Sequence, residues 1–103
     1  MKTHHLKTDP TPFCGVWAGD KTHEIRLNDR DFQVGDCLVL FETENSGEMM
    51  RACNIPVEFT GRMVCATVSH IQEGYGLMPG WVIMSLQEQT TSTVAPNDAR
   101  ELF

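Results

Sequence analysis

Six charged side chains gather in one short stretch of the chain, GDKTHEIRLNDR, which begins at Gly19. Four of them are the candidates for a site: Lys21, Glu24, Arg26 and Arg30. Cations grouped in this way can bind an anion, and a carboxylate beside a lysine can act as a general base on a water molecule. This stretch is therefore the first candidate for a functional site.

Two local signals predict how these side chains are presented. Gly19 is a natural helix terminator, because glycine takes the left-handed conformation after the last helical turn without a Cβ clash. Lys21 then falls in a connection between a helix and a strand. From residue 22 the side chains of the strand alternate, so Glu24 and Arg26 share a polar face. The opposite face carries His23, Ile25 and Leu27.

The polar face leads to a turn signal at residues 28 and 29, and Arg30 lies just beyond it. We therefore expect the four charged groups to converge at one end of a sheet, with Glu24 and Arg26 paired. Charge clusters at turns are usually solvated. The ordinary interpretation is thus a strand edge whose surface ion pair contributes roughly 0 to 1 kcal/mol.

The composition is that of a single globular domain. The chain has 103 residues, of which 41% are hydrophobic and 21% are charged, and this suits one core. No apolar run approaches the roughly 20 residues that cross a bilayer, and the opening MKTHHLKTDP lacks the apolar segment of a signal peptide. We expect a cytoplasmic protein with no membrane partner.

The cysteines and histidines do not predict a metal site. Cys14, Cys37, Cys53 and Cys65 are scattered and form no CxxC pair, so buried free thiols are the expectation. His4 and His5 are adjacent and would face opposite sides of a strand, while His23 and His70 are isolated. We expect neither a metal nor another cofactor.

The net charge of −6 argues against binding of nucleic acid by a broad basic surface. The distribution of charge is uneven. Residues 1–31 carry five of the eight basic groups and five acidic groups, whereas residues 32–103 carry three basic and nine acidic groups. Any site for an anion is therefore expected in the first third of the chain.

The remaining pattern predicts an α+β protein with a strongly curved mixed sheet or barrel and one or two short helices. A helix begins at Asp9-Pro10 and ends at Gly19, and its apolar stripe consists of Phe13, Val16 and Trp17. Strands are predicted at residues 2–7 on an edge, at 37–44 as a central strand, and at 60–71 and 81–86.

Two segments lack a clear pattern. Residues 45–59 form an excursion without periodicity, which is either a functional flap or an elongated loop. We expect residues 1–87 to form the domain and residues 88–103 to be a loose polar tail. Ala99, Leu102 and Phe103 are the candidates for docking the end of this tail as a final turn.

The charged stretch also resembles a known signature. Gly19, Lys21, Glu24 and Arg26 spell GxKxxExR, which resembles the motif of the ASCH domain, a branch of the PUA-like superfamily of small β-barrels. The segments MKTHHLKTDPTPF, IRLNDRDFQVGDCLVL and GYGLMPGWVIMSL are similar to a small bacterial and phage subfamily of ASCH-like proteins. The resemblance covers roughly residues 1–87.

The resemblance implies a PUA-like barrel with a cleft beside the motif that binds RNA or a modified nucleotide. Lys21, Arg26 and Arg30 would then meet an anion or a base edge, with Glu24 among them. Tyr75 or Trp81 would stack on a base, although Trp81 begins an apolar strand and is also a candidate for the core.

Two further functions stay open. Some small ASCH proteins are similar to amidohydrolases that remove an acyl group from a modified cytidine with a lysine, a threonine and a glutamate. Lys21 matches the lysine, Glu24 stands where the threonine is expected, and Glu73 is a weaker match to the glutamate. Lys21 and Glu24 would then be the catalytic pair. The third function is a protein–protein interaction module, and the sequence does not indicate an oligomeric state.

Overall fold

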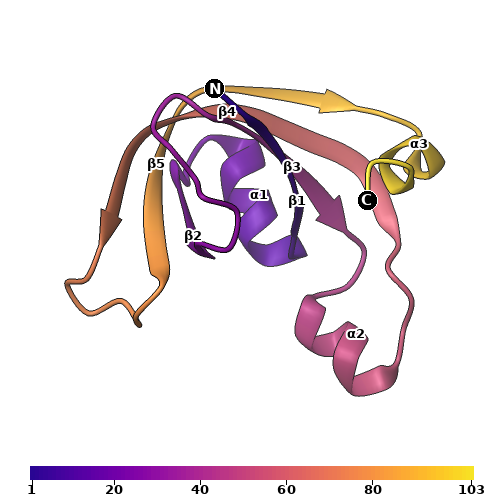
Figure 1. Cartoon of the computed structure of the whole chain (residues 1–103). Helices are drawn as coiled ribbons and strands as arrows, with labels where there is room; N and C mark the ends of the chain where they lie inside the picture. The colour runs from indigo at the N-terminus through magenta and orange to yellow at the C-terminus, as the bar shows by residue number, and fades with distance from the viewer.

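The computed structural model describes residues 1–103 as a five-stranded mixed sheet curved into a half-barrel, with three short helices (Figure 1). The predicted α+β class with a strongly curved sheet is confirmed. The elements follow in the order β1 (Thr3–Thr8), α1 (Pro10–Ala18), β2 (His23–Leu27), β3 (Cys37–Thr43), α2 (Gly47–Cys53), β4 (Phe59–Glu73), β5 (Trp81–Thr93) and α3 (Pro96–Arg100).

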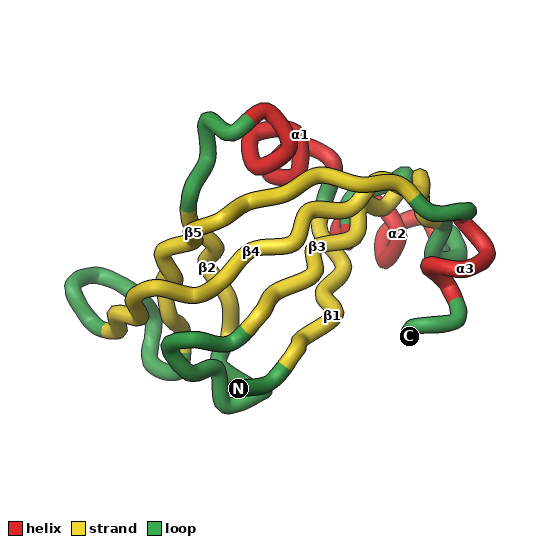
Figure 2. Tube along the Cα trace, turned by 90° about the horizontal axis from the view of Figure 1, so that it is seen from above, coloured by secondary structure: helices red, strands yellow, loops and turns green.

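The strands are arranged in the order β1-β3-β4-β5-β2, so β1 and β2 are the two edges. β1 runs parallel to β3, and every other neighbouring pair is antiparallel. Figure 2 looks down on the sheet and shows α2 and α3 gathered at the same end of the molecule. The half-barrel is open between its two edge strands, and this opening carries the site described below.

Helix α1 lies within the curve of the sheet (Figure 1). It starts with Pro10 and ends at Gly19, whose φ of 84° is in the left-handed region as predicted. Phe13 and Val16 are fully buried and join a core of 12 residues contributed mainly by the strands, against which Trp17 also packs. The predicted helix and its apolar stripe are confirmed.

A second, smaller core covers the other face of the sheet. It consists of Val39, Phe41, Phe59 and Ala99. Strand β3 is sandwiched between the two cores and is buried from residue 38 to residue 43, so the predicted doubly buried strand is confirmed.

The prediction of a loose tail at residues 88–103 is wrong. β5 continues to Thr93 and pairs with β4 along its whole length, and Gly61 on β4 accepts a hydrogen bond from Val94 N. Ala99 of α3 is fully buried, and Phe103 stacks on Phe59. The second half of β5 is polar because it is exposed, and its backbone ladder holds it in place.

The excursion at residues 45–59 contains a helix that the sequence does not predict. The Ser46 hydroxyl caps α2 by accepting a hydrogen bond from Met49 N, and Asn54 ends the helix in the left-handed conformation. No residue of α2 is buried. A helix that buries no side chain needs no apolar stripe, so the sequence of α2 shows no helical periodicity.

The four cysteines are free, but the expectation that they are buried is wrong. Cys14 and Cys53 are exposed, and Cys37 and Cys65 are half-buried. Burial, with a smaller effect of neighbouring Cys37, raises the pKa of the Cys65 thiol. No three His, Cys, Asp or Glu side chains are grouped so that they could hold a metal ion. None of the helices is long and apolar enough to traverse a bilayer.

Candidate functional site

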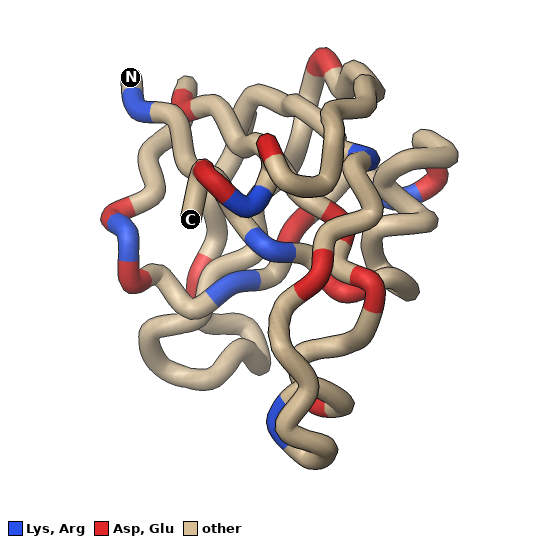
Figure 3. The backbone as a smooth tube through the Cα atoms, turned by 90° about the vertical axis from the view of Figure 1, so that its right-hand side faces the viewer, with Lys and Arg blue, Asp and Glu red and all other residues tan.

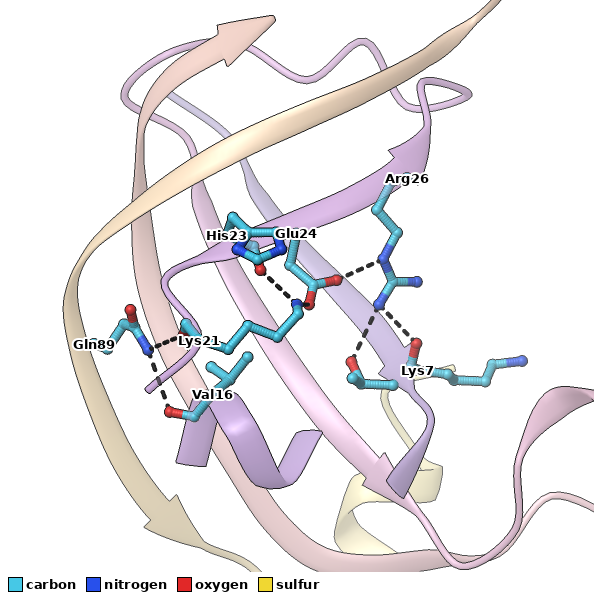
Figure 4. A network of polar contacts seen from close by, with 8 residues as sticks. Lys7, Val16, Lys21, His23, Glu24, Arg26 and Gln89 are labelled. Carbon is cyan, nitrogen blue, oxygen red and sulfur yellow. Dashed lines mark hydrogen bonds and ion pairs between the residues drawn. The ribbon is translucent and has the colours of Figure 1, made fainter. Parts of the chain in front are cut away.

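The carboxylate of Glu24 lies at the centre of the charged stretch (Figure 4). Its Oε1 accepts a hydrogen bond from Lys21 Nζ at 2.9 Å, and its Oε2 accepts one from Arg26 Nε at 3.0 Å. Glu24 is only 4% exposed, whereas Ile25 and Leu27 on the opposite face are each 46% exposed. The polar face of β2 therefore points into the half-barrel, and the interpretation as a solvated edge is wrong.

Lys21 is positioned by its contacts with α1. Its backbone N–H donates to Gly15 O at 3.0 Å, and Gln89 Nε2 donates to Lys21 O at 3.3 Å and to Val16 O at 3.2 Å. Gly15 leaves room for the lysine stem, because a Cβ added there would lie 3.0 Å from Lys21 Cβ. Lys21 Nζ also donates to His23 O. One of the three ammonium N–H groups is left for a ligand.

Arg26 spans the open side of the half-barrel. Its Nη2 donates to Lys7 O at 2.9 Å and to the Thr8 hydroxyl at 3.1 Å, both on β1. The hydrogen bonds of Arg26 use Nε and Nη2 only, so the two N–H groups of Nη1 have no protein partner. Lys21, Glu24 and Arg26 are called the floor triad below.

The floor triad lies in a cleft of about 610 Å³ between the two edge strands and the start of α2. Charged side chains dominate its lining: the basic ones are Lys7, Lys21, Arg26, Arg30 and Arg51, and the acidic ones are Asp9, Glu24 and Asp29. Five of the eight basic groups of an acidic chain thus surround one cleft. Figure 3 shows several Lys and Arg positions close together across the middle of the view, interleaved with acidic ones.

The structure brings together four of the predicted site residues and leaves two outside. Lys21, Glu24, Arg26 and Arg30 all line the cleft, so their predicted convergence is confirmed, and Arg30 Nη1 donates to His5 O at 3.3 Å. The other two, Glu73 and Tyr75, do not line it. Glu73 ends β4 with an exposed side chain, and Tyr75 lies in the β4–β5 turn with 93% of its surface exposed.

Trp81 is the aromatic residue that lines the cleft. It begins β5, is half-buried, and is paired in register with Leu27 of β2. Ile25 and Leu27 border the cleft as well, although the alternation of β2 puts their side chains on the face opposite to Glu24 and Arg26. Of the two stacking candidates from the sequence, only Trp81 borders the cleft.

Sequence reasoning missed the cleft residues on β1 and α2. Lys7, Thr8 and Asp9 come from the end of β1 and the start of α1, and Arg51 comes from α2. Asp9 Oδ1 accepts a hydrogen bond from Gly47 N at 3.0 Å and so ties the start of α2 to the start of α1. No local pattern signals these contacts, since they depend on the two edge strands facing each other.

Fold and site define a small α+β half-barrel with a charged cleft at its open side. The chain belongs to the family described as domain of unknown function DUF3850, whose model matches residues 3–86. No curated protein matches the chain. The matched segment contains the floor triad and all the basic residues that line the cleft.

Proposed function

We propose that the chain is a PUA-like module of the ASCH type that binds RNA or a modified nucleotide in this cleft. The observation that carries the proposal is the floor triad, in which a buried carboxylate holds a lysine and an arginine at the base of a cleft. The GxKxxExR resemblance supports the same assignment, since its lysine, glutamate and arginine are the three members of that triad.

The hydrogen-bonding groups left unused on the floor suit the edge of a base. One N–H of Lys21 and two of Arg26 are free to donate, and the carboxylate of Glu24 has lone pairs beyond the two it uses. A site for a simple anion would need donors only. Donors next to an acceptor are what the Watson–Crick edge of a splayed base requires.

Trp81 supplies the second element of base recognition. It is partly exposed and borders the cleft. Stacking of a base on an aromatic side chain contributes roughly 1–3 kcal/mol and does not depend on a basic protein surface. The acidic net charge of the chain is therefore compatible with a ligand of one or a few nucleotides.

The same geometry gives less support to an amidohydrolase that acts on an acylated nucleoside. Each oxygen of Glu24 already accepts a hydrogen bond from a cation, so the carboxylate is engaged in a protein ion-pair network rather than left free to contact a water molecule. Glu73 lies outside the cleft lining. A hydrolase would need a free general base and a second catalytic group in the cleft. A binding module needs neither.

The test is a screen by thermal shift and mass spectrometry against nucleosides, modified nucleosides and short RNA oligomers. Lys21→Met keeps the aliphatic stem that packs on Gly15 and removes the charge, while Lys2→Ala removes a cation that does not line the cleft. We expect ligands to stabilise the wild type and the Lys2 variant but not the folded Lys21 variant.

Two other outcomes of the screen would contradict the proposal. Loss of an acyl mass from a ligand would identify a hydrolase. If no ligand shifts the melting temperature, the binding module is wrong, and the interpretation as a protein–protein interaction module is favoured.

A further inference from the structure

The positive charge that no carboxylate neutralises is concentrated on the cleft. Four of the eight basic side chains form ion pairs with carboxylates, namely Lys21, Arg26, Arg62 and Arg100. The four without such a pair are Lys2, Lys7, Arg30 and Arg51, and the last three line the cleft. Lys7, Arg30 and Arg51 are called the cationic rim below.

The cationic rim is assembled from three separate segments. Lys7 comes from β1, Arg30 follows β2, and Arg51 belongs to α2. Lys7 and Arg30 contact groups other than carboxylates: Lys7 Nζ lies 5.6 Å from the Phe103 ring centroid, and Arg30 donates to His5 O. All three side chains are exposed, so they can approach a ligand without loss of an internal ion pair.

The position of Arg51 depends on how α2 is attached. Asp9 holds the first residue of α2 through Gly47 N. The guanidinium of Arg51 then lies against Gly47, because a Cβ added there would be 3.1 Å from Arg51 Nη1. Asp9 and Asp29 also line this part of the cleft. The three cations of the rim outnumber these two carboxylates, so the net charge of this part of the cleft is positive.

Floor and rim differ in the ligand group that each can accept. At the floor, Glu24 already neutralises one of two cations, and its buried carboxylate would repel a phosphate. At the rim, three exposed cations without acidic partners are suited to a dianion. A ligand that places a polar base on the floor and a phosphate on the rim satisfies both regions.

We propose that the cationic rim binds the phosphate of the ligand, so that the site takes a nucleoside phosphate rather than a free nucleoside. This inference rests on the proposed function and adds the phosphate to it. The cleft volume of about 610 Å³ is within the range of sites for a single small molecule. The site therefore holds one nucleotide, either free in solution or at the end of an RNA strand.

The experiment compares matched ligands with and without phosphate by isothermal titration calorimetry. The probes are the four common ribonucleosides and an N-acylated cytidine, their 5′- and 3′-monophosphates, and RNA tetranucleotides with and without a 5′-phosphate. The proteins are the wild type, Arg51→Gln and Arg30→Gln, with Lys2→Ala as the matched control for a cation outside the cleft.

We expect the wild type to bind the preferred monophosphate roughly ten times more tightly than its nucleoside. Arg51→Gln and Arg30→Gln should each reduce that ratio about threefold or more and leave nucleoside affinity within about twofold, whereas Lys2→Ala should change neither. The advantage of the phosphate should shrink as salt is raised. Tighter binding of the phosphorylated tetranucleotide would identify a strand end as the source, and tighter binding of the monophosphate a free nucleotide.

The two proposals fail in different ways. Equal affinity for nucleoside and monophosphate would overturn the cationic rim and leave the base site intact. A phosphate advantage that survives both rim substitutions would also overturn the rim. Absence of binding by every probe would overturn both proposals.

Discussion

Arg26 joins the carboxylate of Glu24 to the opposite edge of the half-barrel. The two residues are two positions apart on β2, and Arg26 Nε lies 3.0 Å from Glu24 Oε2. The same guanidinium donates to Lys7 O and to the Thr8 hydroxyl on β1. β1 and β2 are the two ends of the strand order and share no backbone ladder. A side chain therefore spans the opening in which a ligand would bind.

Arg26→Lys should lower stability although it keeps the charge. A lysine can retain the contact with Glu24 but cannot also reach both acceptors on β1, because it lacks the planar fork of the guanidinium. We expect the free energy of unfolding to fall by about 1–3 kcal/mol, with faster amide exchange along β1. Arg30→Lys removes a single 3.3 Å bond to His5 O and should change stability by less than about 0.5 kcal/mol. Similar losses in both variants, measured by urea unfolding, would contradict the bridging role.

Glu24→Gln should reduce both stability and binding. The amide cannot neutralise Lys21 and Arg26, which the structure leaves about three-quarters buried. We expect the free energy of unfolding to fall by about 2 kcal/mol. A fully buried charge without a partner would cost more, but both cations stay partly exposed to solvent. Unfolding in urea and titration with the ligand found in the screen check this. A variant that binds normally and loses only turnover would instead indicate a catalytic carboxylate.

The sequence predicts those residues of the site whose positions are set by local signals, namely a helix end and the alternation of side chains along a strand. Gly19 ends α1, and the alternation along β2 places Glu24 and Arg26 on one face. Alternation says which side chains share a face, but it does not say which face is inside. The charged face of β2 is buried and its apolar face is exposed, because the charges satisfy one another and α1 closes the space above Lys21.

The parts that could not be predicted depend on distant contacts or on exposed polar elements. Arg51 reaches the cleft only because Asp9 holds the start of α2. The second half of β5 looks like a tail in sequence because its side chains are polar and exposed, yet its backbone pairs with β4. Exposed elements held mainly by backbone hydrogen bonds give little hydrophobic pattern to read.

Two Arg–Glu pairs of different burial should differ in their contribution to the free energy of unfolding. Arg62 binds Glu42 through two hydrogen bonds of 2.8 and 2.7 Å and lies 4.9 Å from the Trp17 ring centroid. Burial alone would raise the pKa of Glu42, but hydrogen bonds from Arg62 and Thr60 outweigh it, and the pKa is lowered. The matched pair, Arg100 and Glu58, is largely exposed.

Arg62→Ala should therefore cost about 3 kcal/mol, since it leaves a buried carboxylate without its cation. Arg100→Ala should cost less than about 1 kcal/mol. Thermal unfolding followed by tryptophan fluorescence measures both, and only the Arg62 variant should alter the emission of the folded state through Trp17. Equal shifts in melting temperature for the two variants would show that the burial of the ion pair does not determine how much it stabilises the fold.

The C-terminal segment should be required for full stability, contrary to the prediction of a loose tail. Deletion of residues 96–103 removes Ala99 from the second core and takes the Phe103 ring away from Phe41 and Phe59, which become more exposed. We expect a loss of about 2–4 kcal/mol and increased binding of a hydrophobic dye. Met78→Ala, which shortens a 68% exposed side chain in the β4–β5 turn, should change neither measurement. Unaltered urea unfolding of the truncated chain would contradict the docking of α3.

Acid should weaken the fold through Asp36. Its carboxylate accepts hydrogen bonds from His4 Nε2 at 2.8 Å, from Lys2 N and from Gln33 N. These contacts, that of His4 foremost, lower the pKa of Asp36 from 3.8 to about 2. A folded-state pKa below the unfolded value gives stability that is fully present above about pH 4 and is lost as the pH falls towards 2.

The measurement is urea unfolding at a series of pH values from 7 down to 2. Asp36→Asn should be less stable than the wild type at pH 7, because the amide nitrogen cannot accept the two hydrogen bonds that Oδ2 accepts. Its stability should also fall less steeply between about pH 4 and pH 2, since the group that titrates there is gone. Asp31→Asn is the control, because that carboxylate is exposed and accepts a hydrogen bond from the side chain of Gln33. Parallel pH profiles for wild type and Asp36→Asn would assign the acid sensitivity to other carboxylates.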